Sequence, residues 1–358
     1  METRIKKIAQ ALCDCQADAI VLHGKDNRRY FVGFRSSAGT VAITREGKAA
    51  FAVDFRYITT ARQALENSPM VCQLVDAGGE DAWIGAFLRD NCCKRVLVEE
   101  DVLSHRQVKL LESLWKVELA DGSDILRQLR SIKSAAELKK VRASQQIAEY
   151  SLQQTFDALR PGMTEHQVEA YLTWRLLENG SENGIFGIVA ASGPNSALPH
   201  AVPSNRELQA GDFLLIDFGA IYEGYYSDIS RTVAIGHATQ KMEQIYQLVL
   251  DANCAAINAL RPGLTGHQVD VVARDYIAAA GYGQCFGHGL GHAVGLDIHE
   301  SPRLRTGSKD LLQQGNIVTI EPGIYLPGEF GVRIEDLLYL TEAGCENLTR
   351  MSKKLTVI

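Results

Sequence analysis

The sequence predicts an α/β domain over residues 1–125, followed by an α+β domain over residues 126–358. In the first part, short apolar runs alternate with amphipathic helical patterns, which is typical of a sheet covered by helices. In the second part, one helix junction occurs twice with nearly the same residues, which indicates a duplicated unit and a pseudo-symmetric domain. A chain of 358 residues is long enough for two domains, each with its own core.

The order of its elements predicts the first domain. An amphipathic helical pattern interrupted by charges opens the chain, and strands and helices then follow in turn. Buried strands are expected at 18–24, 49–55 and 94–101, and helices at 56–67 and 104–115. A boundary signal, Asp121-Gly122-Ser123, precedes one long predicted helix over 131–156 that is rich in Lys, Glu and Ala.

Two segments of the second domain repeat each other. LRPGMTEHQV begins at Leu159 and LRPGLTGHQV begins at Leu260, 101 residues later. In each segment, Pro-Gly ends one helix, Thr is placed to cap the next, and an apolar helical stripe follows. Two similar junctions arising by chance are the alternative, but the extent of the match favours duplication. His166 and His267 belong to the repeat as helix-start residues, so we interpret them as structural.

Composition excludes several classes of protein. The net charge of −6 includes no long run of either sign, which argues against a nucleic-acid partner. The N-terminus lacks the apolar core of a signal peptide, and no stretch reaches membrane-spanning length. The eight cysteines form no C-x-x-C pair, so reduced thiols in a cytoplasmic protein are the simplest interpretation.

The stretch LLIDFGAIYEGYYSDISRT, residues 214–232, predicts a β-hairpin. Its strands are expected at 214–218 and 229–234, joined by a turn that contains glycine. A loop with an even number of residues places Asp217 and Asp228 on the same face, directly or diagonally opposite each other. Two like charges placed that way among apolar residues require either a proton or a cation between them.

Four further pieces carry titratable side chains. Taken singly, each has a simple structural explanation, because a strand carboxylate often pairs with arginine and a histidine in a Gly-rich loop often marks only a turn. NSALPHA contains His200, FGHGLGHAVGLDIHESPR contains His288, His292, His299 and Arg303, IVTIEPGIY contains Glu321 and Tyr325, and GVRIEDLLYL contains Arg333 and Glu335.

Taken together, the carboxylates indicate metal ions. Asp217, Asp228, Glu321 and Glu335 all lie in or at the ends of apolar β-type segments. If ionised they carry about four negative charges, which two divalent cations would neutralise, and one neutral imidazole would complete the ligands. Oxygen ligands with one nitrogen suit Mn, Co, Fe(II) or Zn. Bridging carboxylates hold two ions roughly 3.5–4 Å apart, an arrangement that activates water and stabilises an anionic intermediate.

The order of these residues resembles that of the pita-bread metallopeptidases, which include methionine aminopeptidase, aminopeptidase P and prolidase. Asp217 is followed by Asp228 eleven residues later, then by His292 in GHAVGLDIHE, Glu321 in IEPGIY and Glu335 in RIED. DNRRYFVGF and VDFRYITTA resemble the first domain of aminopeptidase P, prolidase and creatinase. The resemblance therefore implies a creatinase/prolidase-like α/β domain followed by a pita-bread domain with pseudo-twofold symmetry.

The resemblance also implies roles at the metal site. Asp217 would bind one ion, Asp228 and Glu335 would bridge two, and His292 would bind the ion that Asp217 does not hold. Glu321 would be a ligand beside a bridging hydroxide and a catalytic base or proton shuttle. The implied cofactor is a pair of divalent metal ions, Mn²⁺ foremost, with Co²⁺, Zn²⁺ or Fe²⁺ as alternatives.

Around the substrate, the resemblance implies two more catalytic residues, His200 and His299, which would stabilise the tetrahedral intermediate and move protons. His288 would line the pocket for the proline ring, and Tyr325 would lie near the substrate. Arg333 would orient the bridging glutamate and its neighbours.

The function that the resemblance implies is that of an Xaa-Pro aminopeptidase, which hydrolyses the bond before a penultimate proline by attack of a metal-bridging hydroxide. An Xaa-Pro dipeptidase (prolidase) is the alternative, because Arg303 stands where a prolidase would place an arginine for the dipeptide's carboxylate. A surface arginine in a loop explains Arg303 equally well.

A non-catalytic binding protein on the same fold is a further alternative from another class. Creatinase shares both domains without the metal carboxylates, whereas this chain keeps all five metal ligands. The expected partners are short peptides with a penultimate proline and a second copy of the chain in a homodimer, with no nucleic acid and no membrane.

Overall fold

The computed structural model describes residues 2–182 and 187–358 and divides the chain into two compact units, residues 1–130 and 131–358. The predicted boundary at 125/126 falls inside helix α6 (Ser123–Ser131), most of which belongs to the first unit. Leu126 is buried there, and the Arg130 guanidinium donates to Asn27 Oδ1 at 2.9 Å. Within the described ranges, the model contains no helix that is long and apolar enough to cross a membrane.

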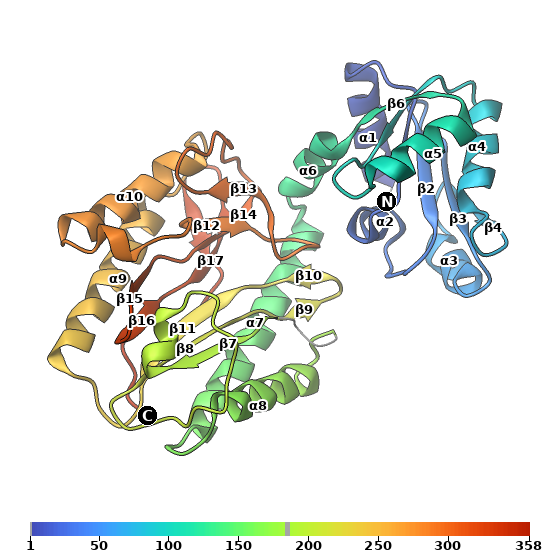
Figure 1. The fold of residues 1–358 in the computed structure, drawn as a ribbon. Helices are drawn as coiled ribbons and strands as arrows, with labels where there is room; N and C mark the ends of the chain where they lie inside the picture. The colour runs from blue at the N-terminus through green and yellow to red at the C-terminus, as the bar shows by residue number, and fades with distance from the viewer. Residues whose placement is uncertain (1, 183–186) are drawn as a thin grey trace. The chain divides into compact units, whose positions relative to one another are not determined.

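A six-stranded sheet forms the centre of the first unit, in the order β4-β3-β2-β1-β5-β6 (Figure 1). The pairs β1–β5, β5–β6 and β3–β4 are parallel, whereas β2 is antiparallel to both of its neighbours. The strands are β1 (Ala19–Leu22), β2 (Thr40–Thr44), β3 (Ala49–Val53), β4 (Met70–Leu74), β5 (Arg95–Val98) and β6 (Glu118–Asp121). The three predicted strands are confirmed as β1, β3 and β5, which occupy largely buried positions, as their runs of Ala, Ile and Val favour.

Helices connect most of these strands. They are α1 (Glu2–Asp14), α2 (Lys25–Val32), α3 (Ile58–Leu65), α4 (Glu80–Asp90) and α5 (His105–Trp115). The two predicted helices are confirmed as α3 and α5. α5 begins where expected because Ser104 and Gln107 form a capping box.

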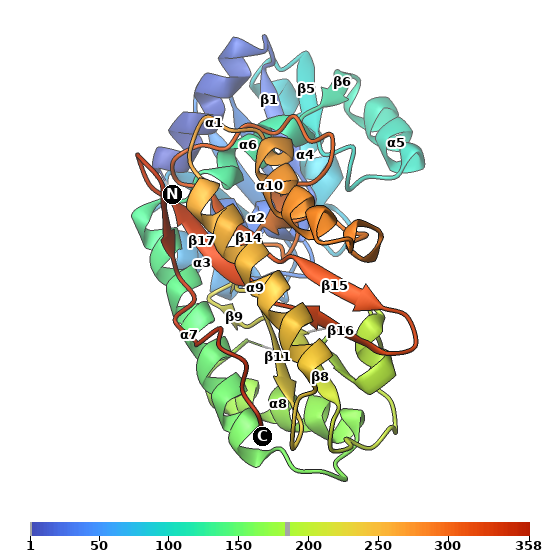
Figure 2. The same cartoon turned by 90° about the vertical axis from the view of Figure 1, so that its left-hand side faces the viewer.

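In the second unit, two helices and a three-stranded antiparallel sheet make up the first half (Figures 1 and 2). Its elements are α7 (Ala135–Ala158), α8 (Glu165–Glu178), β7 (Val189–Ser192), the short helix η1 (Gly193–Ala197), β8 (Phe213–Phe218) and β11 (Ile229–Ala234). Leu152 of α7, Leu172 of α8 and Ile216 of β8 belong to one buried apolar core.

The helix predicted over 131–156 is wrong at its start. Residues 132–134 separate α6 from α7, and α7 begins only after Ser134, whose hydroxyl accepts from Glu137 N in a capping box. Lys133 in this break is buried and forms an ion pair with Glu300 at 3.1 Å. The composition of residues 131–156 does not reveal this break, because Lys and Ser are also tolerated inside a helix.

The second half of this unit repeats the plan with a five-stranded sheet in the order β13-β12-β14-β17-β18. Its helices are α9 (Gln240–Ala259), α10 (Gly266–Ala279) and η2 (Gly283–Cys285). Its strands are β12 (Gly291–Ala293), β13 (Glu300–Leu304), β14 (Ile317–Ile320), β17 (Asp336–Leu340) and β18 (Cys345–Asn347), with a separate hairpin of β15 (Gly323–Leu326) and β16 (Phe330–Arg333). Figures 1 and 2 show α10 beside α9, as α8 is beside α7.

The repeated junctions have the same main-chain bonding, which supports the predicted duplication. Thr164 and Thr265 cap α8 and α10, each in a capping box with the glutamine three residues later. Gly162 N donates to Leu208 O at 3.0 Å, and Gly263 N donates to Leu312 O at 2.9 Å. The match therefore extends beyond the motif to the segment against which each junction packs.

The predicted hairpin is confirmed, with β8 and β11 antiparallel and a short extension of β9 (Ile221–Tyr222) and β10 (Tyr225–Tyr226). Glu223 and Gly224 in the turn both have positive φ, of 47° and 86°, as a type I′ turn requires. Asp217 pairs with Ser230. Asp228 precedes Ser230 by two residues, so it lies diagonally opposite Asp217 on the same face of the sheet.

Candidate active site

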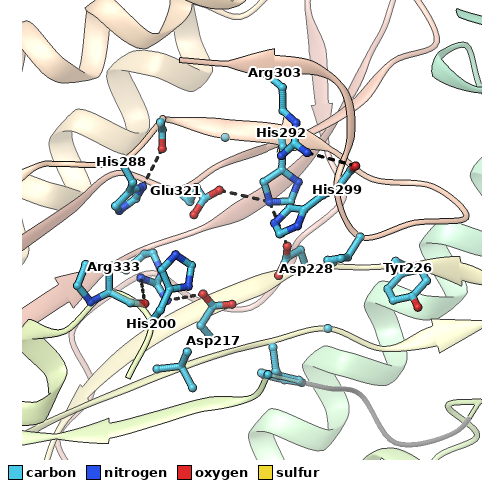
Figure 3. Close-up of a pocket in the computed structure, with 18 of the residues that line it drawn as sticks. His200, Asp217, Tyr226, Asp228, His288, His292, His299, Arg303, Glu321 and Arg333 are labelled. Atoms are coloured by element: carbon cyan, nitrogen blue, oxygen red, sulfur yellow. Dashed lines mark hydrogen bonds and ion pairs between the residues drawn. The ribbon is translucent and has the colours of Figure 1, made fainter. Parts of the chain in front are cut away.

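A cavity of about 450 Å³ opens in the second unit, between the hairpin of the first half and the β12–β14 region of the second (Figure 3). Strand ends and loops from both halves therefore supply its wall. Its charged and titratable lining residues are His200, Asp217, Tyr226, Asp228, His288, His292, His299, Arg303, Arg305, Glu321 and Arg333. Sequence segments that lie far apart in the chain are thus brought to one place.

Three predicted metal ligands meet beside this cavity. Ligand atoms of Asp228, His292 and Glu335 all lie within 4.8 Å of one another. His292 Nε2 is 3.5 Å from Asp228 Oδ2 and 3.4 Å from Glu321 Oε1, and Figure 3 shows the ring between these two carboxyls. Glu335 is not among the lining residues, and its carboxyl is buried behind them.

The carboxyls of this cluster are held where ionisation is costly. Burial, followed by the charges of Asp217 and Glu321, raises the pKa of Asp228 well above its ordinary value. Burial and the charge of Asp228 do the same to the pKa of Glu335. Burial raises the pKa of Glu321 to about 8, with Arg333 opposing this effect and Asp217 adding to it.

His292 is held as a neutral ligand. Burial and the neighbouring His299 lower the pKa of His292 to about 3. Its Nδ1 lies 3.2 Å from the carbonyl oxygen of Ala293, which can only accept a hydrogen bond. Nδ1 therefore carries the proton, and the lone pair of Nε2 faces the carboxyls. If neither carboxyl carried a proton and no cation were present, that lone pair would face two acceptors.

A divalent metal fits this arrangement. Glu335 Oε1 is buried and has no hydrogen-bond partner among the described residues, which leaves its lone pairs available. The other oxygen, Oε2, accepts from Ser230 Oγ at 2.7 Å, which fixes the carboxyl plane. Oxygen atoms with one imidazole nitrogen are the donor set that Mn²⁺, Zn²⁺, Co²⁺ and Fe²⁺ accept.

Asp217 faces the cluster from the hairpin and is paired with Arg333. Arg333 Nη2 contacts Asp217 Oδ2, and Nη1 donates to the carbonyl of Pro199 at 3.1 Å and to the hydroxyl of Tyr325 at 2.7 Å. Burial lowers the pKa of Arg333, but Tyr325, Asp217 and Glu321 outweigh that effect and keep it well above its ordinary value.

Arg333 reaches Glu335 only through a serine. Its Nε donates to Ser230 Oγ at 3.1 Å, and the same hydroxyl donates to Glu335. Arg333 was predicted to orient Glu335 and its neighbours. In the structure its direct carboxylate partner is Asp217, and Ser230 is the residue that contacts Glu335.

The three remaining histidines surround the same cavity. His288 Nε2 lies 2.8 Å from the hydroxyl of Tyr325, and burial and Arg333 lower the pKa of His288 to about 4. The His299 ring stands edge-on to that of His292 with centroids 4.4 Å apart, and burial lowers its pKa. His200 is exposed and its ring makes no hydrogen bond to a described residue.

Tyr325 does not line the cavity, although it was predicted to bind substrate. It is buried, and its hydroxyl lies between Arg333 and His288. Burial raises the pKa of Tyr325 to about 12, so the hydroxyl stays protonated. In this structure it supports two lining residues from behind.

Arg303 lines the cavity with a guanidinium that no carboxylate of the described residues neutralises. It is half-buried, and its Nη2 lies 3.3 Å from the carbonyl oxygen of His299. Its backbone N–H donates to Asp310 Oδ2 at 2.8 Å, which holds the strand but leaves the charged end unpaired. Burial and the nearby Arg305 lower the pKa of Arg303 without changing its charge near neutrality.

Ser230 and Thr319 were missed by sequence reasoning. Thr319 Oγ1 accepts from His292 N at 3.0 Å and lies 3.3 Å from Glu321 Oε1, so one hydroxyl touches two predicted ligands. A signal was present, because each residue stands two positions from a predicted ligand on the same strand face: Ser230 follows Asp228, and Thr319 precedes Glu321.

Comparison with known proteins agrees with this site. Residues 139–342, more than half of the chain, match the model of metallopeptidase family M24, and residues 4–132 match the creatinase/prolidase N-terminal domain. The chain is 38% identical to a protein from Pyrococcus furiosus named Xaa-Pro dipeptidase, over 99% of this chain and all of that one.

Two solved structures match over 99% of both chains. An Xaa-Pro dipeptidase from Bacillus anthracis superposes with a TM-score of 0.95 at 36% identity. An X-Pro aminopeptidase from Thermotoga maritima superposes with a TM-score of 0.91 at 32% identity. Both similarities include the first unit as well as the second. The chain is therefore a pita-bread metallo-exopeptidase of family M24, in the group that carries a creatinase/prolidase-type first domain.

Proposed function

We propose that this protein is an Xaa-Pro dipeptidase, a prolidase, rather than the Xaa-Pro aminopeptidase expected from the sequence. The observation that carries the proposal is the unpaired guanidinium of Arg303 in the wall of the cavity. A dipeptide ends in a carboxylate at the proline, which a charged guanidinium there would bind. The names of the similar proteins from P. furiosus and B. anthracis support the same choice.

A bond to proline nitrogen sets particular demands on a peptidase. It is a tertiary amide without an N–H, so it cannot donate the hydrogen bond that an extended substrate usually makes. In our proposal two metal ions, most suitably Mn²⁺, are held by Asp217, Asp228, His292, Glu321 and Glu335. When bound, such ions lower the pKa of water and polarise the scissile carbonyl.

The chain's own residues would then orient the peptide and move its protons. His200 and His299, which line the cavity, would donate hydrogen bonds to the oxyanion of the tetrahedral intermediate. Glu321 would take a proton from the attacking water and pass it toward the leaving proline nitrogen. His288 would contact the proline ring. Its imidazole is held in one orientation by the hydroxyl of Tyr325 and the carbonyl of Gly289.

The test compares Ala-Pro with Ala-Pro-amide, which differ only at the carboxylate, and with the longer peptide Ala-Pro-Ala. The Mn²⁺-loaded protein is assayed on Ala-Pro, Ala-Pro-amide and Ala-Pro-Ala, with Ala-Ala-Ala as the control peptide. We expect Ala-Pro to be cleaved best. Arg303→Ala should lower kcat/KM for Ala-Pro by about 10–100-fold, since a charge-assisted hydrogen bond contributes about 1.5–3 kcal/mol, and should change little for Ala-Pro-amide.

Arg305→Ala is the matched control, because Arg305 lines the same cavity two residues further along the chain. Any loss that it causes should be equal for Ala-Pro and Ala-Pro-amide. An equal loss for both substrates with Arg303→Ala would reject the carboxylate role.

An Xaa-Pro aminopeptidase is the second candidate, favoured by the name of the T. maritima protein. Cleavage of Ala-Pro-Ala at least as well as Ala-Pro would establish it in place of the dipeptidase. Cleavage of no proline peptide by metal-loaded protein would favour a non-catalytic binding protein.

The quaternary state is an expectation from the family resemblance, the location is an expectation from the cysteines, and both stay proposals. We propose a homodimer, and we place it in the cytoplasm, a location that agrees with eight cysteines that are free among the described residues. Sedimentation at micromolar concentration tests the dimer, since a monomer at all concentrations would contradict it.

A further inference from the structure

The loop that presents His200 has exposed side chains on either side of its tip. Residues 193–203 leave β7, carry His200 to the cavity and return to Ser204. On either side of His200, Leu198 is 57% exposed and Val202 is 81% exposed. Since the His200 ring makes no hydrogen bond to a described residue, its position depends on how the loop backbone is fixed. Arg333 Nη1 donates to the carbonyl of Pro199 at 3.1 Å beside the tip, and further attachments lie at the two ends of the loop.

One buried carboxylate holds both ends. Glu165 Oε1 accepts from Ser192 N at 2.7 Å and from Ser192 Oγ at 2.8 Å, at the start of the loop. Glu165 Oε2 accepts from Ser204 N at 3.0 Å and from Ser204 Oγ at 2.6 Å, at its end. The amide nitrogen of Asn195 lies 3.1 Å from both oxygens and joins the first turn of the loop to the same group.

The charge of Glu165 is matched to this task. Its side chain is fully buried at the N-terminus of α8, where the helix dipole favours an anion. Five N–H or O–H groups donate to its two oxygens, so an acceptor-only carboxylate fits and an amide would direct its own N–H at other donors. Arg206 Nη1 in turn donates to Ser192 Oγ at 2.6 Å and extends the same network.

Glu165 has no counterpart in the second copy of the repeated junction. The position that Glu165 occupies after Thr164 is occupied by Gly266 after Thr265. In the second half another acid is used: Asp270 Oδ1 accepts from Leu290 N at 3.1 Å and steadies the segment that carries His288. Each helix of the pair thus anchors a different histidine segment.

We infer that Glu165 is a positioning residue, whose buried carboxylate closes the 193–203 loop and thereby sets the place of His200 in the cavity. The inference rests on the proposed function, in which His200 contacts the reacting carbonyl. Glu165 itself is separated from the cavity by the loop and touches no lining side chain that the proposed reaction uses.

The test is a double-mutant cycle with Ala-Pro as substrate. Glu165→Gln keeps the size of the side chain and should lower kcat/KM by about tenfold or more, since misplacement by about 1 Å can cost 10²-fold. In the His200→Ala background the same change should cost less than about twofold, because the group it positions is absent. Asp270→Asn is the matched control, and its factor should be equal in both backgrounds.

Hydrogen exchange supplies a readout that does not depend on turnover. Glu165→Gln should speed amide exchange in residues 193–204 by about tenfold and leave residues 286–290 unchanged. Asn195→Ala, which removes one donor, is tested in the same way in case Glu165→Gln does not fold.

Two results would overturn the inference: an equal loss of kcat/KM with and without His200, or unchanged exchange in residues 193–204. A wild-type protein that binds metal but leaves Ala-Pro intact would refute the proposed function instead. The exchange experiment would then still decide whether Glu165 closes the loop.

Discussion

Removal of the metal should make the stability of the second unit fall as the pH rises. The reason lies in the buried carboxyls beside the cavity. Asp228 is 7% exposed and Glu335 is 1% exposed, and both have raised pKa values in the metal-free chain. Glu321 has a pKa of about 8. Metal ions would take the place of the protons that these groups otherwise retain.

The sign and size follow from Glu321. Its pKa in the folded, metal-free chain lies above its ordinary value of 4.5, so folding favours the protonated form. The stabilisation is therefore fully present below pH 4.5 and is lost as the pH rises through about 8. The step from 4.5 to about 8, at about 1.4 kcal/mol per pKa unit, corresponds to about 5 kcal/mol. For a unit of this size that is a fall in Tm of about 10–20 °C.

The assay is thermal unfolding of chelator-treated protein from pH 5 to pH 9, repeated with Mn²⁺ in excess. The metal-free Tm should fall across this range, and added Mn²⁺ should remove most of the fall. Glu321→Gln, which cannot ionise, should show a smaller dependence without metal. A metal-free Tm that is flat or rises between pH 5 and pH 9 would show that these carboxyls do not retain protons, and the reasoning would be refuted.

Three substitutions test other parts of the structure. Asp228→Asn should abolish Ala-Pro hydrolysis and weaken Mn²⁺ binding more than about 100-fold. Metal content after dialysis measures the binding. Full occupancy with normal turnover would contradict the assignment of Asp228 as a metal ligand. Gly291→Ala would put a Cβ 2.1 Å from the carbonyl oxygen of Thr319, so it should lower the free energy of unfolding by about 1–3 kcal/mol. Gly287→Ala is the control and should cost little, because a Cβ there would meet open space. Equal losses for the two variants would disprove the close approach at Gly291. Thr265→Ala should lower stability by about 1 kcal/mol in denaturant unfolding through loss of the helix cap, and an unchanged midpoint would argue against the capping box.

Local patterns were enough to predict the parts of the fold that depend on periodicity. The common face of Asp217 and Asp228 followed from the even loop, because strand side chains alternate strictly. The two cap threonines followed from the repeated motif. The start of α7 did not, since the break before Ser134 depends on a buried ion pair with the distant Glu300.

The sequence alone does not predict those site residues whose positions depend on loops and tertiary packing. That His288 and His299 face the same cavity depends on tertiary packing and came from the family resemblance alone. Tyr325 was expected near the substrate because it matches a tyrosine of the resembling family, yet its hydroxyl, on the β15–β16 hairpin, lies between Arg333 and His288 behind the cavity wall. Glu165 gave no chemical signal, because a glutamate at a helix start usually serves only the helix dipole.

Gly266 has a consequence for any attempt to exchange the two halves. A Cβ at this position would lie 2.0 Å from the carbonyl oxygen of Arg303, whereas the matching position in the first half holds a full glutamate side chain. A chimera that copied the first junction into the second would push the strand that bears Arg303 out of place. A working chimera would therefore have to keep glycine at position 266, even if it took every other residue of the junction from the first half.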